Sequence, residues 1–161
     1  MDAENKKHIQ KLQGAIFLRC QQASDILVLS SLLQDALVSN ADFHFDKKDN
    51  SFVFVANRFC WATPPIKSEK SENDVYYRVL SGVNIQNVIS VKHKNMKQFQ
   101  DNEGALFYNL LAIEYDNETN DISLVFSDMV GMKISITDLN IFIRDIAEPF
   151  PTKHIPNHFD G

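Results

Sequence analysis

Three residues near the end of one strand-like run have side chains suited to binding an anionic ligand. The run from Phe52 to Trp61 reads FVFVANRFCW, and Asn57, Arg58 and Trp61 lie in its second half. A guanidinium group forms two parallel hydrogen bonds to a carboxylate or phosphate, and an indole ring supplies an apolar wall beside it. These residues therefore predict a ligand pocket where the run ends.

The same residues also have a purely structural interpretation. Buried arginines are seldom left unpaired, so an ion pair with Glu114 or Asp35 also accounts for Arg58. Trp61 would then seal the rim of a sheet, because an indole ring buries a large apolar area. An exposed Trp61 would instead anchor a partner protein. Arg78, in a later strand-like run, is the fourth candidate for ligand or partner binding.

Two histidines near the C-terminal end have the spacing of a metal-binding pair. His154 and His158 form an H-x₃-H pair, and Asp160 follows them. A zinc site takes three or four ligands on rigid elements, and no Cys/His cluster supplies the remaining ones. The sequence therefore predicts no metal site and no cofactor.

A small basic patch lies at the end of another strand-like run. Lys92-His93-Lys94 is followed by Lys97, with the acidic residues Asp101 and Glu103 close behind. Such a patch is typical of a solvated sheet edge that discourages association between sheets. In a pleckstrin-homology-like domain it would hold an anionic head group, but the acidic neighbours weaken that interpretation.

No set of residues meets the requirements of a catalytic site. The sequence has no Gly-rich phosphate loop, no nucleophile elbow and no HExxH motif. Glu114 and Asp116 lie in or near a turn, where we expect both carboxylates to be hydrated. Cys20 and Cys60 lie in apolar runs and are expected to be free, buried thiols; a disulfide would require neighbouring strands. The sequence thus favours a non-enzymatic protein.

Composition and charge disfavour several classes of protein. The 161 residues carry a formal net charge of −5, with 44% hydrophobic and 23% charged residues. General nucleic-acid binding is disfavoured, since its affinity comes mostly from neutralised phosphates. No apolar run approaches the roughly 20 residues of a membrane-spanning helix, and the first residues lack the apolar segment of a signal peptide. We expect a soluble, cytoplasmic protein.

The chain is most simply one domain, because a domain of this length buries about 70% of its unfolded surface. We expect a polar lead-in over residues 1–12, a globular domain over 13–150 and a surface tail over 151–161. A charged, exposed loop over 67–74 follows Pro64-Pro65, through which no strand continues.

Apolar periodicity predicts a strand, a helix, about six or seven further strands and a closing helix. Ser24 is placed to cap the first helix, which runs to about Leu37. Thr137 or Asp138 caps a closing helix, whose apolar positions fall at i, i+3, i+4 and i+7: Leu139, Phe142, Ile143 and Ile146. The predicted strands cover residues 15–19, 41–45, 52–61, 76–83, 84–94, 106–115, 122–126 and 132–136.

These elements predict an α+β fold with antiparallel pairing, since the connections between successive strands are short. So many strands in a small domain twist strongly, which bends a sheet into two packed layers or a partly open barrel. With the closing helix over one end or one face, the outline is pleckstrin-homology-like. A sheet with both helices on one face is the alternative.

Four segments carry a resemblance to a known family. They are Leu33-Gln34-Asp35-Ala36, Asn57-Arg58-Phe59-Cys60-Trp61, the hairpin over 122–136 and the tail over 149–158. In order and spacing they are similar to an uncharacterised family of small alphaproteobacterial proteins, a domain of unknown function, over about residues 15–158. Its strongest motif is Asn-Arg-Phe-x-Trp. The resemblance implies single-domain form and localisation, but no chemistry.

The chain departs from the family pattern in three places. Ala62 stands where the family has an acidic residue after its Trp, and Tyr76-Tyr77-Arg78 stands where it has a run of arginines. The third hairpin reads Ser127-Asp128-Met129-Val130-Gly131, whereas that of the family is glycine-rich. A function of the acid or of the arginine run is therefore not carried over to this chain.

The sequence favours a non-enzymatic domain that binds a protein or peptide partner. Binding would use a sheet edge or the groove between the last helix and the sheet. The alternative is a sensor of a small anionic molecule, or an enzyme, with a pocket near Arg58 and Trp61. Oligomeric state is left open.

Overall fold

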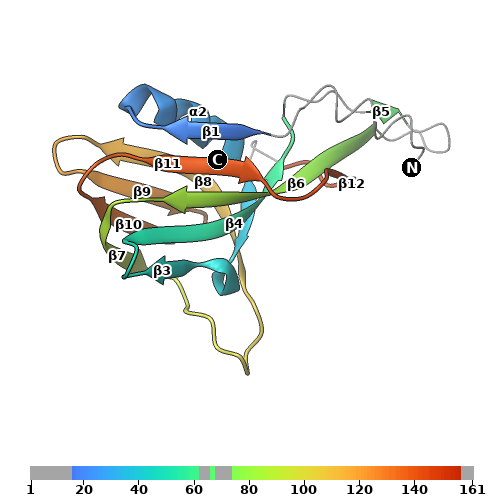
Figure 1. Ribbon diagram of the computed structural model, residues 1–161. Helices are drawn as coiled ribbons and strands as arrows, with labels where there is room; N and C mark the ends of the chain where they lie inside the picture. The colour runs from blue at the N-terminus through green and yellow to red at the C-terminus, as the bar shows by residue number, and fades with distance from the viewer. Residues whose placement is uncertain (1–15, 62–65, 68–73, 157–161) are drawn as a thin grey trace.

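The computed structural model describes residues 16–61, 66–67 and 74–156 (Figure 1). The predicted lead-in over 1–12, the Pro64-Pro65 turn, most of the charged loop over 67–74 and the end of the tail lie outside the described residues. The described part contains one α-helix, α2 (Ala23–Leu33), one 3₁₀ helix, η1 (Asn40–Asp42), and twelve strands. The strands are β1 (Phe17–Cys20), β2 (Ala36–Ser39), β3 (His44–Asp46), β4 (Ser51–Phe59), β5 (Ile66–Lys67), β6 (Asp74–Ile85), β7 (Val88–Lys94), β8 (Phe107–Asp116), β9 (Asp121–Phe126), β10 (Gly131–Ile136), β11 (Ile141–Asp145) and β12 (Phe150–Thr152).

The strands form one curved sheet in the order β1-β11-β6-β4-β2-β8-β9-β10-β7. β3 pairs with β4, while β5 and β12 pair with β6. Every pairing among the described strands is antiparallel, as predicted from the short connections. β4 has β6 on one side and β2 and β3 on the other, so the strand-like run with the candidate site lies inside the sheet.

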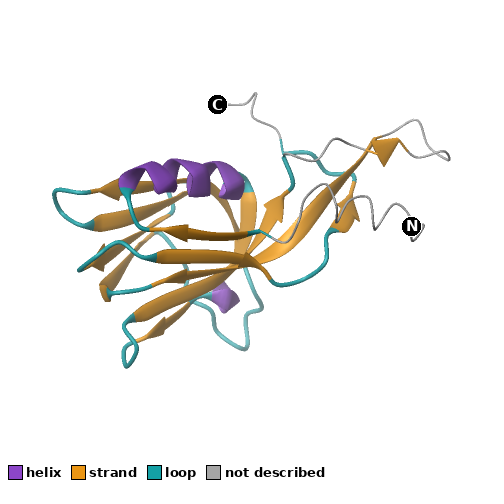
Figure 2. Ribbon diagram, turned by 45° about the horizontal axis from the view of Figure 1, so that its top comes forward, coloured by secondary structure: helices purple, strands orange, loops and turns teal. Residues whose placement is uncertain are grey.

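Alternating side chains of the strands enclose one main apolar core. On β4, Phe52, Phe54 and Ala56 are buried while the residues between them are partly exposed, which is the period-two pattern of a strand with one buried face. Side chains from both ends of the sheet join this core, among them Leu124 of β9 and Ile143 of β11. The sheet therefore curves around its own inner face, and α2 lies along one side of it (Figure 2).

The first helix is shorter than its periodicity predicts. Asp25 Oδ2 accepts from the backbone N–H of Gln22 at 3.3 Å, which satisfies a donor at the helix start. Asp35 then has a left-handed backbone, with φ of 62°, and its N–H donates to Leu110 O of β8 at 2.7 Å. Ala36 and Leu37, which were predicted as helix, form the start of β2 instead, because β8 and β4 offer this strand backbone partners on both sides.

The predicted closing helix is wrong, because its central residues form strand β11. Ile141 and Ile143 are fully buried, Phe142 is partly exposed and Arg144 is exposed. Helical spacing arose because Phe142 also has a contact on the outer face, where its ring lies 6.2 Å from that of Phe17. β11 pairs with β1 and β6, and alternating β-branched residues suit such a strand between two neighbours.

The pleckstrin-homology-like fold and the two-helix α+β alternative are therefore both corrected. In the described residues the single α-helix lies near the N-terminal end, and an open antiparallel sheet forms nearly everything else. The predicted strand over 84–94 is also divided. β6 ends at Ile85 and β7 begins at Val88, because Asn87 adopts a left-handed backbone with φ of 59°.

Candidate functional site

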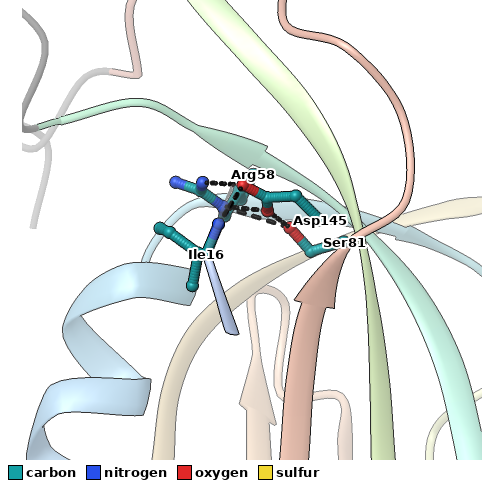
Figure 3. Close-up of polar contacts among 4 residues, drawn as sticks. All are labelled: Ile16, Arg58, Ser81 and Asp145. Atoms are coloured by element: carbon teal, nitrogen blue, oxygen red, sulfur yellow. Dashed lines mark hydrogen bonds and ion pairs between the residues drawn. The ribbon is translucent and has the colours of Figure 1, made fainter. Parts of the chain in front are cut away.

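Arg58 lies in a closed polar cluster on the inner face of the sheet (Figure 3). Its Nη2 donates to Asp145 Oδ2 at 2.9 Å, and its Nε lies 3.2 Å from Asp145 Oδ1 and 3.1 Å from Ser81 Oγ. The Ser81 hydroxyl donates to Asp145 Oδ1 at 2.6 Å, and the Ile16 N–H donates to Asp145 Oδ2 at 3.1 Å. We call these four residues the Arg58 cluster.

The Arg58 cluster joins four strands or strand ends that are distant in the sequence. Arg58 is on β4, Ser81 on β6 and Asp145 on β11, while Ile16 directly precedes β1. The side chains of Arg58 and Asp145 are only 4% and 8% exposed, so both charges have left water. The predicted partners Glu114 and Asp35 are not those that bind Arg58. Asp145 already occupies the two donor positions of the Arg58 guanidinium, and this ion pair connects strands of the sheet.

Arg78 and Asn57 lie on the opposite, outer side of β4. Arg78 Nη1 donates to the backbone O of Asn57 at 3.0 Å, and its guanidinium carbon lies 5.7 Å from the centre of the Phe59 ring. Burial lowers the pKa of Arg78, while the charge of Asp35 and the Cys60 thiol oppose that shift. The side-chain Oδ1 of Asn57 is buried and has no hydrogen-bond partner among the described residues. The two neighbouring residues Asn57 and Arg58 thus serve different faces.

Trp61 is partly exposed on this outer face, beside the aromatic rings of Phe59 and Tyr76. Its indole N–H donates to Gln34 O at 3.1 Å, and its ring centre lies 4.5 Å from that of Phe59. The indole remains 41% exposed, so it covers the outer side of the helix-to-strand connection and still presents an edge to solvent. Assignment of Asn57, Arg58, Trp61 and Arg78 to ligand or partner binding stays a prediction.

The cysteines and histidines lack a reactive arrangement in the part of the chain that the structure describes. Cys20 and Cys60 are both buried as thiols outside any disulfide, as predicted. Burial, and secondarily the charge of Asp25, raises the pKa of the Cys20 thiol to about 11, so this thiol is protonated at neutral pH. No group of three His, Cys, Asp or Glu residues is placed to hold a metal among the described residues. His154 is exposed, and His158 and Asp160 lie outside them.

A broad groove lies on the outer face of β7, β9 and β10. It has a volume of about 680 Å³ and reaches Leu111 of β8 and the turn over 127–130. Its exposed apolar side chains include Met129, which is 73% exposed, and Leu111, which is 42% exposed. Gly131 pairs in register with Val125 and Lys94, and it lines the groove without adding a side chain to it. We call this the lysine groove.

Three lysines line the lysine groove: Lys92, Lys94 and Lys133. The Lys133 ammonium lies 3.6 Å from Asp121 Oδ2. Lys92 and Lys94 have no carboxylate within ion-pairing distance among the described residues. Asp128 is the one acidic residue among the described residues that line the groove. The groove therefore combines an apolar floor with excess positive charge on a chain whose net charge is −5.

The basic patch of the sequence is divided between two faces of β7. Lys92 and Lys94 pair in register with Lys133 and Gly131, whereas His93 pairs with Met132, whose side chain points into the core. Sequence reasoning found the patch and missed the groove beside it. The missing signal is a β-bulge, because the register of β8 and β9 shifts between Leu110 and Ala112 and leaves Leu111 out of the ladder.

A family model described as "Protein of unknown function (DUF2948)" matches residues 16–158. The chain belongs to this family. The DUF2948 match begins at Ile16 of the Arg58 cluster and includes every described strand. No curated protein and no solved structure gives a significant match. The alphaproteobacterial origin and the Asn-Arg-Phe-x-Trp motif of the predicted family stay predictions.

Membership in DUF2948 supplies no chemistry, so the arrangement of side chains must carry any functional proposal. No helix in the described parts of the chain is long and apolar enough to cross a membrane. The Arg58 cluster is closed, whereas the lysine groove is open to solvent with unpaired charges. The lysine groove is therefore the stronger candidate site.

Proposed function

We propose that this protein is a non-enzymatic interaction domain whose lysine groove binds an acidic amphipathic helix of a partner protein. The observation that carries the proposal is the groove itself, in which exposed Leu111 and Met129 lie beside unpaired Lys92 and Lys94. Exposed apolar side chains gathered beside charged ones are typical of a protein-binding surface. This groove takes the place of the one predicted beside a closing helix that does not exist.

A helix suits the shape of the lysine groove. The groove lies over the outer face of paired strands, so one of its sides is open to solvent along the sheet. Pockets for small molecules bury most of the ligand surface, which a sheet face does not do. An α-helix is about 10 Å wide and can place residues i, i+3, i+4 and i+7 on such a floor.

Charge favours an acidic partner. Lys92, Lys94 and Lys133 would lie beside the flank of a helix docked on Leu111 and Met129. Glutamates on that flank would pair with lysines that lack carboxylate partners or, for Lys133, have only a long contact of 3.6 Å. Complementary charge speeds association and rejects wrong partners more than it adds affinity.

Methyl NMR of methionine tests the proposal with two reporters in one protein. Met129 lines the lysine groove, whereas Met96 lies in a different cavity. The probe is a designed helical peptide with leucines at i, i+3, i+4 and i+7 and glutamates elsewhere. We expect it to shift the Met129 methyl signal in a saturable way and to leave Met96 unchanged.

The same peptide with lysine in place of glutamate is the first control, and we expect it not to bind. Lys92→Glu combined with Lys94→Glu should raise the dissociation constant of the acidic peptide at least about tenfold. Lys47→Glu with Lys48→Glu changes the charge equally in an exposed hairpin away from the groove, so it should have little effect. Equal binding of both peptides, or no Met129 shift, would contradict the proposal.

A further inference from the structure

The curved sheet does not close between β3 and β7. β3 pairs with β4 alone and β7 with β10 alone among the described strands. At one end a hydrogen bond crosses the gap, since the Val88 N–H donates to Asn50 O at 2.8 Å. At the other end the two strands enclose a cavity of about 380 Å³, which we call the seam cavity. Its volume falls within the usual range of small-molecule pockets, roughly 300–1,000 Å³.

The walls of the seam cavity belong to the margin of the apolar core. Phe43, Phe45, Val91 and Met96 all line it, and all four are only partly buried while packing against the core. Phe52, which is 2% exposed, also borders the cavity, so the cavity reaches the interior of the fold. An apolar ligand body would therefore extend a core that the protein has left incomplete on this side.

The ionisable residues that line the seam cavity are both basic in the part of the chain that the structure describes. They are Lys97 and His93, the inward residue of the divided basic patch; no carboxylate of a described residue lines the cavity. The Lys97 ammonium contacts Glu103 Oε2 at 2.8 Å, and both side chains are largely solvated, so this pair can be exchanged for a ligand at little cost. A rim that carries the Lys97 ammonium above an apolar interior fits an anionic head on an apolar body.

A buried asparagine fixes the connection that forms the rim. Asn40 is 8% exposed, and its Nδ2 donates to Lys97 O at 2.9 Å while its Oδ1 accepts from Leu106 N–H at 2.8 Å. The Lys97 N–H also donates to the hydroxyl of Tyr108 at 3.1 Å. Both ends of the connection between β7 and β8 are thereby tied to one side chain, which holds Lys97 at the cavity mouth before any ligand arrives.

We propose that the seam cavity binds a small amphiphilic anion, with an alkyl or aryl body against Phe43, Phe52 and Met96 and a carboxylate-like head beside His93 and Lys97. This site lies on the side of β7 opposite Lys92 and Lys94, and His93 borders both the seam cavity and the lysine groove. It also differs in place from the anionic-ligand pocket that the sequence predicted near Arg58, whose guanidinium is already bound by Asp145.

Octanoate and 1-octanol are the probes, because they share a chain length and differ in the charge of the head. With methyl-labelled methionine, octanoate should shift the Met96 signal in a saturable way and leave Met129 unchanged. Octanol should bind at least several-fold more weakly. A Met129 shift without a Met96 shift would place the amphiphile on the lysine groove and overturn the assignment, as would the absence of any saturable shift.

Two variants test separately the binding of the apolar body and the binding of the anionic head. Ala41→Phe fills the mouth from an exposed position of η1, and we expect it to abolish the Met96 shift with both probes. Lys97→Gln should weaken octanoate several-fold and leave octanol unchanged. Equal affinity for the two probes, or unchanged octanoate binding by Ala41→Phe, would overturn the proposal. Dispersed amide spectra of both variants establish that each is folded.

Discussion

Removing the carboxylate of Asp145 tests whether the Arg58 cluster holds the sheet together. Asp145→Ala deletes the acceptor of two Arg58 contacts, at 2.9 and 3.2 Å, and of bonds from Ser81 and Ile16. The guanidinium, on a side chain that is only 4% exposed in the intact protein, would keep Ser81 as its side-chain acceptor among the described residues. Breaking one side of a buried ion pair typically costs roughly 3–5 kcal/mol. That loss is a large part of the roughly 5–15 kcal/mol by which a domain is stable.

Urea unfolding of a double-mutant cycle measures this loss. Arg58→Met should also destabilise the protein, because it leaves Asp145 buried and unpaired. The double variant Arg58→Met, Asp145→Ala should lose far less stability than the sum of the losses of the two single variants, since it leaves neither charge of the ion pair buried without a partner. Lys133→Ala breaks an exposed contact with Asp121 and should cost much less. A loss below about 1 kcal/mol for Asp145→Ala, or strict additivity, would refute the reasoning.

Three further predictions concern the corrected strand, the buried thiol and the rim of the seam cavity. Ile141→Ala should cost roughly 2–5 kcal/mol in urea unfolding, far more than Ile146→Ala, because Ile141 is 0% and Ile146 is 49% exposed; the reverse order would support the predicted helix. The pKa of Cys20 is higher in the folded state than in the unfolded chain, so deprotonation of this thiol favours the unfolded state. The free energy of unfolding should therefore fall as pH rises from about 9 toward about 11, and Cys20→Ala should flatten that fall; an unchanged slope would contradict it. Asn40→Ala should cost about 1–3 kcal/mol and speed hydrogen exchange at the Leu106 amide, and slow exchange there would show that the asparagine does not hold the rim.

Period-two patterning was sufficient for the strands that have one buried face and a turn at each end. The run from Phe52, the run over 106–115 and the hairpin strands that follow it correspond to β4, β8, β9 and β10. Buried residues alternate along β4, β9 and β10, so the local pattern alone determines those elements. In β8 the bulge at Leu111 separates the buried Leu110 and Ile113 by three positions. The C-terminal part was harder to predict, because the apolar Phe142 lies on the outer face of the sheet and makes the sequence resemble a helical repeat. Only the pairing of β11 with β1 and β6, a long-range fact, distinguishes the two interpretations.

The candidate site was predictable as a set of residues and not as an arrangement. The sequence identified Arg58 as a residue that needs a carboxylate, but Asp145 lies 87 residues away and has no local feature that marks it as the partner. The patch at Lys92-His93-Lys94 was also identified. Its division between two faces follows from strand alternation, but the meaning of each face depends on a bulge at Leu111 and an unclosed seam.

The pairing of β1 with β11 has a consequence for how the chain folds as it is made. β1 has no other partner strand among the described residues, and the bond from Ile16 to Asp145 spans 129 positions. At roughly 5–20 residues per second, a ribosome needs several seconds or more to synthesise that interval. Until β11 has been synthesised, the edge of β1 has no partner strand and Arg58 lacks the carboxylate of Asp145. Contacts this distant also slow refolding, so the last step of assembly should be the docking of β11 between β1 and β6.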